Sequence, residues 1–282
     1  MLTILNSISS LTAENALSLT QANLQKTLTQ LSSGLKINSG SDDAAGLAIA
    51  NGLQANISAL SQSSQNASDG IGLLQTADGA LSQVTTLLNR AVTLATEASN
   101  GGLSTSQSDA VNTEYQSILT EIGNIGSTTN FNGEAVFGTT ANVYTSDGTT
   151  SGSNTVSTAI GALTTTALAL NTTQDTTPGT TTATDLSTAA GAQAALALIT
   201  TAIGTVAANR GAIGAAVNQL TADTNVQNTE VTNLTSAQND VQNADIGQTV
   251  AKMTQYNVLQ QTGMAALSRS NQAQQAVLKL LQ

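Results

Sequence analysis

A seven-residue repeat of apolar side chains constrains this chain more than any other feature of its sequence. The repeat predicts one long helix that packs lengthwise on a partner, about 80 Å long at a rise of 1.5 Å per residue. Gly101 and Gly102 follow the last periodic residue and predict its end. The repeat consists of Leu53, Leu60, Ala67, Leu74, Leu81, Leu88 and Ala95, with Ile57, Ile71 and Val92 three residues before Leu60, Leu74 and Ala95.

The same periodicity returns in the second half of the chain. Ile213, Leu220, Leu234 and Val241 share one seven-residue series, which passes through the polar Gln227. A shorter helical pattern between about Ser104 and Gly126 would form an αα-hairpin with the first long helix. These patterns predict a mainly α fold: a long antiparallel, coiled-coil-like helical bundle.

Apolar stripes also mark both ends of the chain, where a free terminus would normally be polar. At the N-terminal end the stripe consists of Leu24, Leu28, Leu31 and Leu35, and at the C-terminal end of Ile246, Val250, Met253, Leu278 and Leu281. Two apolar helical ends need a partner. Either they pair with each other or they are buried between subunits.

Two adjacent acidic residues, Asp42 and Asp43, follow a Gly/Ser-rich turn and precede the stretch AAGLAIANGL. Helix starts favour Asp because its carboxylate accepts hydrogen bonds from free backbone N–H groups. We therefore interpret the two residues as turn and helix N-cap, and a metal or acid/base pair as the alternative. The chain has no His, Cys or Trp, which excludes histidine bases, cysteine nucleophiles and nitrogen or sulfur metal sites. We expect no enzyme activity and no cofactor.

The charge of the chain is strongly acidic, with 17 Asp and Glu against 7 Lys and Arg. Such a surface repels phosphate backbones, so nucleic acid is not an expected partner. The apolar stretch from Ala189 to Ala208 is interrupted by polar residues and predicts a packed helix rather than a membrane span. The first eleven residues carry no positive charge, so no cleavable signal peptide is expected.

The middle of the chain carries β signals. Asn132-Gly133 and Asp147-Gly148 are turn dipeptides that bound short runs with Val136, Phe137, Val143 and Tyr144, which predicts a small β-hairpin region. Residues 139–188 are rich in Thr, Ser and Gly, and we expect an exposed loop with some β structure. Their hydroxyls could carry O-linked sugars, or the segment could be a bare flexible loop.

Three motifs together resemble the bacterial flagellins. LSSGLKINSGSDDAAGLAIANGL is similar to their N-terminal signature, and NADIGQTVAKMTQYNVLQQTGMAALSRSNQAQQAVLKLLQ to their C-terminal one. TTNFNGEAVF resembles the entry to the family's β-hairpin. The resemblance covers about 140 N-terminal and 80 to 90 C-terminal residues, in the expected order.

The resemblance implies a short flagellin without large outer domains, a subunit exported through the flagellum's type III channel and polymerised into an extracellular filament. Its inner layer would be an N-terminal helix in residues 1–43 and a C-terminal helix in residues 244–282. Its outer layer would be residues 44–138 and 189–243, with 139–188 as a variable surface segment. Expected partners are copies of the chain itself and the flagellar cap, junction and export-chaperone proteins. The alternatives are the hook–filament junction protein and a non-flagellar adhesin or helical bundle.

The resemblance further implies a contact with the mammalian Toll-like receptor that senses flagellin, through Arg90, Leu94 and Glu114. However, Ala91, Val92 and Thr93 replace part of the charged stretch that usually lies beside that arginine. The alternative for Arg90 and Glu114 is an ordinary exposed ion pair between neighbouring helices.

Overall fold

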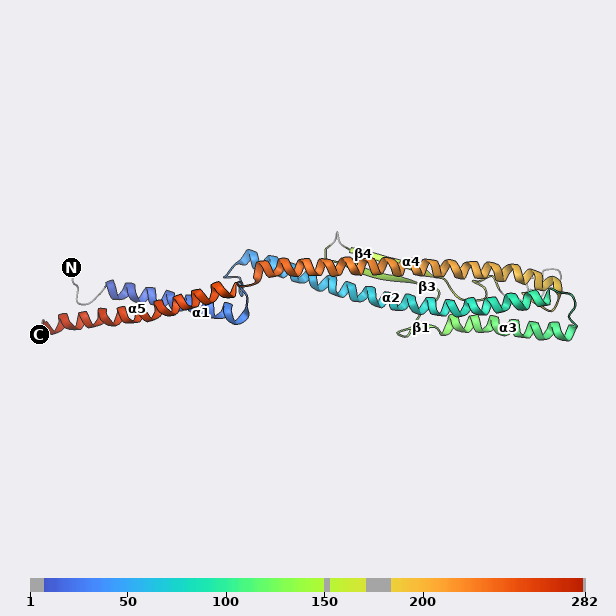
Figure 1. Ribbon diagram of the computed structural model, residues 1–282, viewed down its shortest axis with the longest axis horizontal. Helices are drawn as coiled ribbons and strands as arrows, with labels where there is room; N and C mark the ends of the chain where they lie inside the picture. Colours follow the sequence, from blue (N-terminus) through green and yellow to red (C-terminus); the bar gives the residue numbers. More distant parts are fainter. Residues whose placement is uncertain (1–7, 150–152, 171–183, 281–282) are drawn as a thin grey trace. The chain divides into compact units, whose positions relative to one another are not determined.

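The computed structural model describes residues 8–149, 153–170 and 184–280, which form long helices and two small sheets (Figure 1). The helices are α1 (Ile8–Ser33), α2 (Ala44–Ala98), α3 (Thr105–Thr128), α4 (Ala189–Gln242) and α5 (Ile246–Leu280). The strands are β1 (Asn130–Phe131), β2 (Glu134–Ala135), β3 (Thr139–Ser146) and β4 (Ser153–Ile160). The expectation of a mainly α fold with a small antiparallel β region is confirmed.

The chain divides into two compact units, which we describe separately. The terminal unit comprises residues 1–55 and 232–282, and the central unit comprises residues 56–231. Both α2 and α4 contribute residues to each unit.

In the central unit, the seven-residue repeat of α2 faces the hydrophobic core. Leu60, Ala67, Leu74, Leu81, Leu88 and Ala95 are each at most 2% exposed. The companion residues Ile57, Ile71 and Val92 are only half-buried. The second buried series instead lies three positions after the first, because small side chains there allow close packing. It consists of Ser63, Gly70, Ala77, Val84, Ala91 and Ala98.

Helix α4 contributes a matching buried stripe to the same core. The stripe consists of Ala192, Ala195, Ile199, Ala202, Val206, Ile213, Ala216, Leu220 and the polar Gln227. Arg210 of α4 forms a forked ion pair with Asp78 of α2, with Nε–Oδ1 and Nη2–Oδ2 distances of 2.7 and 3.2 Å. Among the described helices, α4 alone is long and apolar enough to cross a membrane, with a mean hydropathy of 1.5. Core helices of other proteins meet the same test, and α4 has a buried stripe of its own.

Each turn dipeptide lies in a hairpin of its own, so the predicted β-hairpin region consists of two separate hairpins. Asn132 and Gly133 connect β1 to β2 with φ values of 52° and 85°, as a type I′ turn requires. Asp147 and Gly148 follow β3, which pairs with β4 along eight residues from Thr139↔Ile160 to Ser146↔Ser153.

The expectation of an exposed loop with some β structure in residues 139–188 is right about the strands but wrong about the exposure of much of the described part. Val143, Val156, Ile160, Leu163, Leu168, Leu170 and Leu186 all join the core of the central unit. The physical reason is that a strand alternates its side chains, so widely spaced Val and Ile residues among threonines are enough to bury one face. Residues 150–152 and 171–183 lie outside the described residues. The expectation of O-linked sugars on hydroxyls in these two segments therefore also lies outside them.

Candidate functional site

The terminal unit pairs the two ends of the chain, and it contains the residues that the sequence indicates for assembly. Helices α1 and α5 run antiparallel, because residue 10 lies opposite residue 270 and residue 35 lies opposite residue 243 (Figure 1). The first pair is a hydrogen bond of 2.8 Å between the hydroxyls of Ser10 and Ser270. The second is an isolated β-bridge between Leu35 and Asn243.

The two helices meet along a narrow seam with alternating three- and four-residue spacing. On α1 the more buried positions are Ser10, Ala13, Leu17, Thr20, Leu24, Thr27 and Leu31. On α5 they are Thr249, Met253, Tyr256, Gln260, Gly263, Leu267 and Ser270. More than half of these side chains are polar or small. Gly263 lies directly against Leu17, since a Cβ at this glycine would be 3.4 Å from Leu17 Cδ1.

The seam differs from the expected stripe in three positions. Leu28 is 46% exposed, and the buried position beside it belongs to Thr27, which is only 4% exposed. Ile246 and Val250 are likewise exposed, and Thr249 takes the buried position. Sequence reasoning missed both threonines because it followed large apolar side chains, although Leu24, Thr27 and Leu31 keep the heptad spacing.

Large apolar side chains therefore point outward from both helices. Ile8, Leu19, Leu11 and Val258 are 77, 65, 51 and 53% exposed. Leu259 and Met264 of α5 are exposed as well. The side chain of Leu278 and the whole of Leu281 lie outside the described part of the chain.

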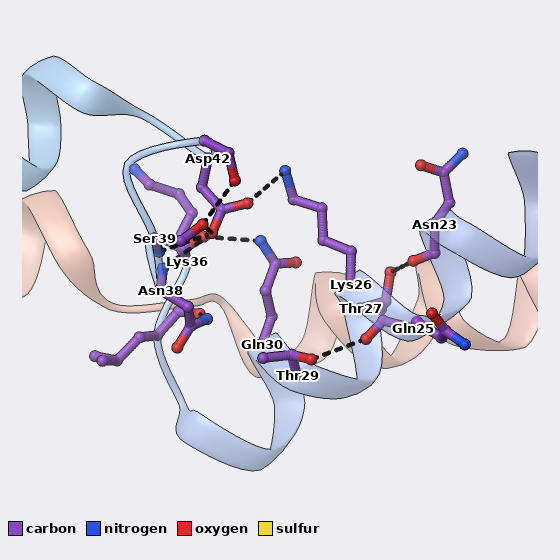
Figure 2. Close-up of polar contacts among 12 residues, drawn as sticks. Asn23, Gln25, Lys26, Thr27, Thr29, Gln30, Lys36, Asn38, Ser39 and Asp42 are labelled. Carbon is purple, nitrogen blue, oxygen red and sulfur yellow. Dashed lines mark hydrogen bonds and ion pairs between the residues drawn. The ribbon is translucent and has the colours of Figure 1, made fainter.

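The segment between α1 and α2 is held by Asp42 (Figure 2). One carboxylate oxygen, Oδ2, accepts hydrogen bonds from the backbone N–H groups of Asn38 and Ser39, both at 3.1 Å. The other, Oδ1, lies 2.8 Å from Lys26 Nζ of α1. The hydrogen bond from Lys26, followed by that from Asn38, lowers the pKa of Asp42 to about 2.

Asp43 has a different task from its neighbour. Its Oδ1 accepts a hydrogen bond of 2.9 Å from the backbone N–H of Gly46, the geometry of an N-cap at the start of α2. A Cβ on Gly46 would lie 2.5 Å from Asp43 Oδ2 and 2.6 Å from Cδ1 of the buried Ile37, so glycine leaves room for the cap. Among the residues that the structure describes, no three acidic side chains gather as a metal site.

The remaining residues of the expected long-helix seam divide between the two units. Leu74, Leu81, Leu88, Ile213 and Leu220 are buried in the central core, and Leu60 is buried as well. Leu53, Leu234 and Val241 belong to the terminal unit and are half-buried there.

The three residues expected to contact a receptor do not share one surface. Arg90 Nε lies 2.7 Å from Glu114 Oε1, and both side chains are about half-exposed. Their hydrogen bond lowers the pKa of Glu114 and raises that of Arg90. Leu94 is only 1% exposed, because its place on α2 faces the core rather than the solvent. The exposed part of the trio is therefore the ion pair.

Both ends of the chain match known families. Residues 4–142 match the family described as the bacterial flagellin N-terminal helical region. Residues 196–281 match the bacterial flagellin C-terminal helical region. The two matches occur in the order and at the ends of the chain that the sequence motifs indicate.

Individual relatives agree with the family matches. Flagellin of Halalkalibacterium halodurans is 34% identical over 260 residues, which cover 91% of each chain. Flagellin of Bacillus subtilis is 31% identical over 302 residues, which cover 98% of each chain. A crystal structure of Bacillus cereus flagellin is 29% identical, with a TM-score of 0.47 over 57% of this chain and 88% of that one. The two family matches and the two flagellin sequences confirm the resemblance, and the chain belongs to the bacterial flagellin family.

Proposed function

We propose that the paired terminal helices are the surface through which this chain, a structural subunit of the extracellular bacterial flagellar filament, polymerises. The observation that carries the proposal is that α1 and α5 each have two faces, one packed against the other helix and one exposed. Their mutual seam is narrow and partly polar, and large apolar side chains such as Leu19 and Val258 remain exposed on the outside. Neighbouring copies would bury these side chains.

Such a pair of helices gains little from its own seam. Isolated helices with narrow apolar stripes are marginal in water, so assembly would couple the ordering of the terminal unit to its burial by neighbours. An interface between two different patches of the same chain builds a helical filament when its rotation does not close into a ring. In this arrangement residues 1–43 and 244–282 form the inner layer. Residues 44–138 and 189–243 form the outer layer, and β3 and β4 pack onto it through their buried side chains.

Further partners follow from the same role. We propose that the unassembled chain travels through the flagellum's own export channel, with its terminal helices held by an export chaperone. Junction proteins below and the cap above would contact these helices in the filament. The measurement is binding of the chaperone to the chain with and without residues 244–282. Equal binding by both would argue against the chaperone contact.

We also propose that the exposed Arg90–Glu114 pair contacts the flagellin-sensing Toll-like receptor. Exposed ion pairs contribute little to stability, so both groups can be recruited by a partner without a large cost to the fold. The test is a reporter-cell assay with purified monomer, in which Arg90→Ala should lower the response. No response to the unmutated protein at micromolar concentration would reject the contact.

The assembly proposal is tested by electron microscopy of purified protein with and without residues 244–282. Long uniform filaments are expected from the full chain alone. A sharper version compares Leu19→Ser and Val258→Ser, which should keep the helical content and raise the critical concentration for assembly, with Gln255→Ser, an exposed control on α5. If all three variants assemble like the unmutated chain, the outward apolar faces do not drive polymerisation.

A further inference from the structure

Helix α4 carries a buried polar side chain within an apolar series. In the seven-residue series from Ile213 to Val241, Gln227 occupies the middle position and is only 7% exposed. A leucine at this position would complete the series and would bury a similar volume without a polar group. The contacts of Gln227 therefore have to explain why a glutamine lies there.

Two hydrogen bonds to one hydroxyl join Gln227 to two further elements. Its Nε2 donates to Ser63 Oγ of α2 at 2.8 Å. The same oxygen accepts from the backbone N–H of Ser146, at the end of β3, at 2.9 Å. Ser63 is itself only 3% exposed. One buried hydroxyl thus ties both α4 and the β3–β4 hairpin to a single position of α2.

The polar groups at this position cost stability. Gln227 Oε1 has no hydrogen-bond donor among the described residues, and neither has Oδ2 of Asp223, one turn earlier on α4. Both oxygens are closed to solvent, so water does not replace the lost partners. In coiled coils a single buried polar side chain lowers stability in the same way and fixes the register of the helices.

The apolar contacts between α2 and α4 define their register only weakly. The two helices run antiparallel, because Ser63 lies opposite Gln227 and Asp78 lies opposite Arg210. A shift by seven residues would replace most buried side chains by similar ones, so apolar burial would change little. Such pairs are Ala195 and Ala202, Ile199 and Val206, and Ile213 and Leu220 on α4, and Leu74 and Leu81, and Leu81 and Leu88 on α2.

The polar contacts, in contrast, exist in one register alone. A seven-residue shift would bring Gln227 opposite Gly70 or Asn56 instead of Ser63. Gly70 offers no side chain, and the space beside it is filled by Val143 of β3, which a Cβ there would overlap. In either direction Arg210 would also leave Asp78. The hydrogen bonds therefore distinguish the observed register more strongly than the apolar core does.

We propose that Gln227, Ser63 and Ser146 form a polar lock, which selects the observed register of α4 against α2 and fixes the β3–β4 hairpin to it at a cost in stability. A seven-residue error would displace α4 by about 10 Å, at a rise of 1.5 Å per residue. The lock acts within the central unit of one chain. The inference goes beyond filament formation and does not depend on it.

The test measures the register as the distance between two spin labels in the unassembled full-length chain. The sequence has no cysteine, so labels can be placed at Asn89→Cys on α2 and Asn218→Cys on α4, both exposed. With the lock intact we expect one narrow distance distribution. Gln227→Leu should add a second population displaced by about 10 Å, while its denaturant midpoint stays equal or rises. Gln219→Leu, at an exposed glutamine of α4, should change neither.

Two results with Gln227→Leu would overturn the proposal. One is a single distance distribution identical to that of the unmutated chain. The other is a lower denaturant midpoint, because the glutamine would then stabilise the core instead of selecting its register.

A double-mutant cycle tests the coupling within the lock. Ser63→Ala leaves the N–H groups of both Gln227 and Ser146 without their acceptor, so the midpoint should fall and hydrogen exchange at the Ser146 amide should accelerate. Adding Gln227→Leu to Ser63→Ala should restore part of the lost midpoint, because a buried unpaired amide is removed. Strictly additive effects of the two substitutions would contradict a lock that works through their contact.

Discussion

At the residue scale, the adjacent aspartates Asp42 and Asp43 make different contacts. Asp43 caps α2 by accepting from the N–H of Gly46, whereas Asp42 joins the turn at Asn38 and Ser39 to Lys26 of α1. Their order in the chain decides which of the two caps the helix. Only the residue immediately before the first helical position can reach the free N–H groups of the helix.

The role of Asp42 predicts an acid-sensitive turn. Its pKa falls from 3.8 to about 2 on folding, so its stabilising effect is complete above pH 4 and is lost as the pH falls toward 2. Hydrogen exchange of the Asn38 and Ser39 amides should therefore accelerate between pH 4 and pH 2, after correction for the intrinsic rates. Asp42→Asn should show faster exchange already at pH 5 and less further change on acidification. Identical profiles for the two proteins would mean that the ion pair with Lys26 does not hold the turn.

At the element scale, close backbone contact constrains α3. A Cβ on Gly126 would overlap the carbonyl oxygen of Leu163 and lie 2.8 Å from Leu163 Cβ. The same helix carries Gly123, where an added Cβ would meet nothing within 4 Å. The two glycines form a useful pair because they lie three residues apart on α3 and differ in their tertiary contact, with Gly126 in the last turn of the helix.

Alanine substitution should act in opposite directions at these two positions. Gly123→Ala should stabilise the chain by about 0.5–1 kcal/mol, since alanine is the better helix former. Gly126→Ala should destabilise it by about 1–3 kcal/mol, the usual cost of overpacking against backbone that cannot move. Chemical denaturation followed by circular dichroism measures both values. Stabilisation by both substitutions would show that Leu163 moves away freely.

The helices were predictable from sequence at this scale, and their close-packed and polar contacts were not. Leucine periodicity marks α2 because large apolar residues recur every seven positions, and Leu60 to Leu88 lie in the core. Ser63, Ala77 and Thr27 lie on buried faces too, yet alanine and hydroxyl side chains give a weaker hydropathy signal than leucine. The same limit applied to β3 and β4, where isolated Val143 and Val156 among threonines are buried. The buried acceptors of Gln227 and Asp223 depend on contacts between α2, α4 and β3 that no local pattern records.

At the scale of the whole molecule, charge is distributed very unevenly. The central unit holds twelve acidic and two basic residues, whereas residues 1–55 and 232–282 together hold five of each sign. The whole net charge of −10 therefore belongs to the central unit. Like charges in neighbouring subunits repel, so each subunit added to a filament brings more acidic surface against acidic surface.

This distribution predicts that filament growth depends on ionic strength even without any specific ion. The Debye length falls from about 30 Å at 0.01 M salt to about 8 Å at 0.15 M, which screens most repulsion between exposed carboxylates. The critical concentration for growth should accordingly fall between 10 and 150 mM NaCl, a range with little effect on apolar burial. Replacing the exposed Glu97 and Glu134 by Gln should flatten this dependence, while Glu14→Gln in the charge-balanced terminal unit should change it less. Light scattering of seeded growth gives all the values. The proposal fails if the unmutated chain, the double variant and Glu14→Gln show the same salt dependence. The uneven charge would then have no bearing on assembly.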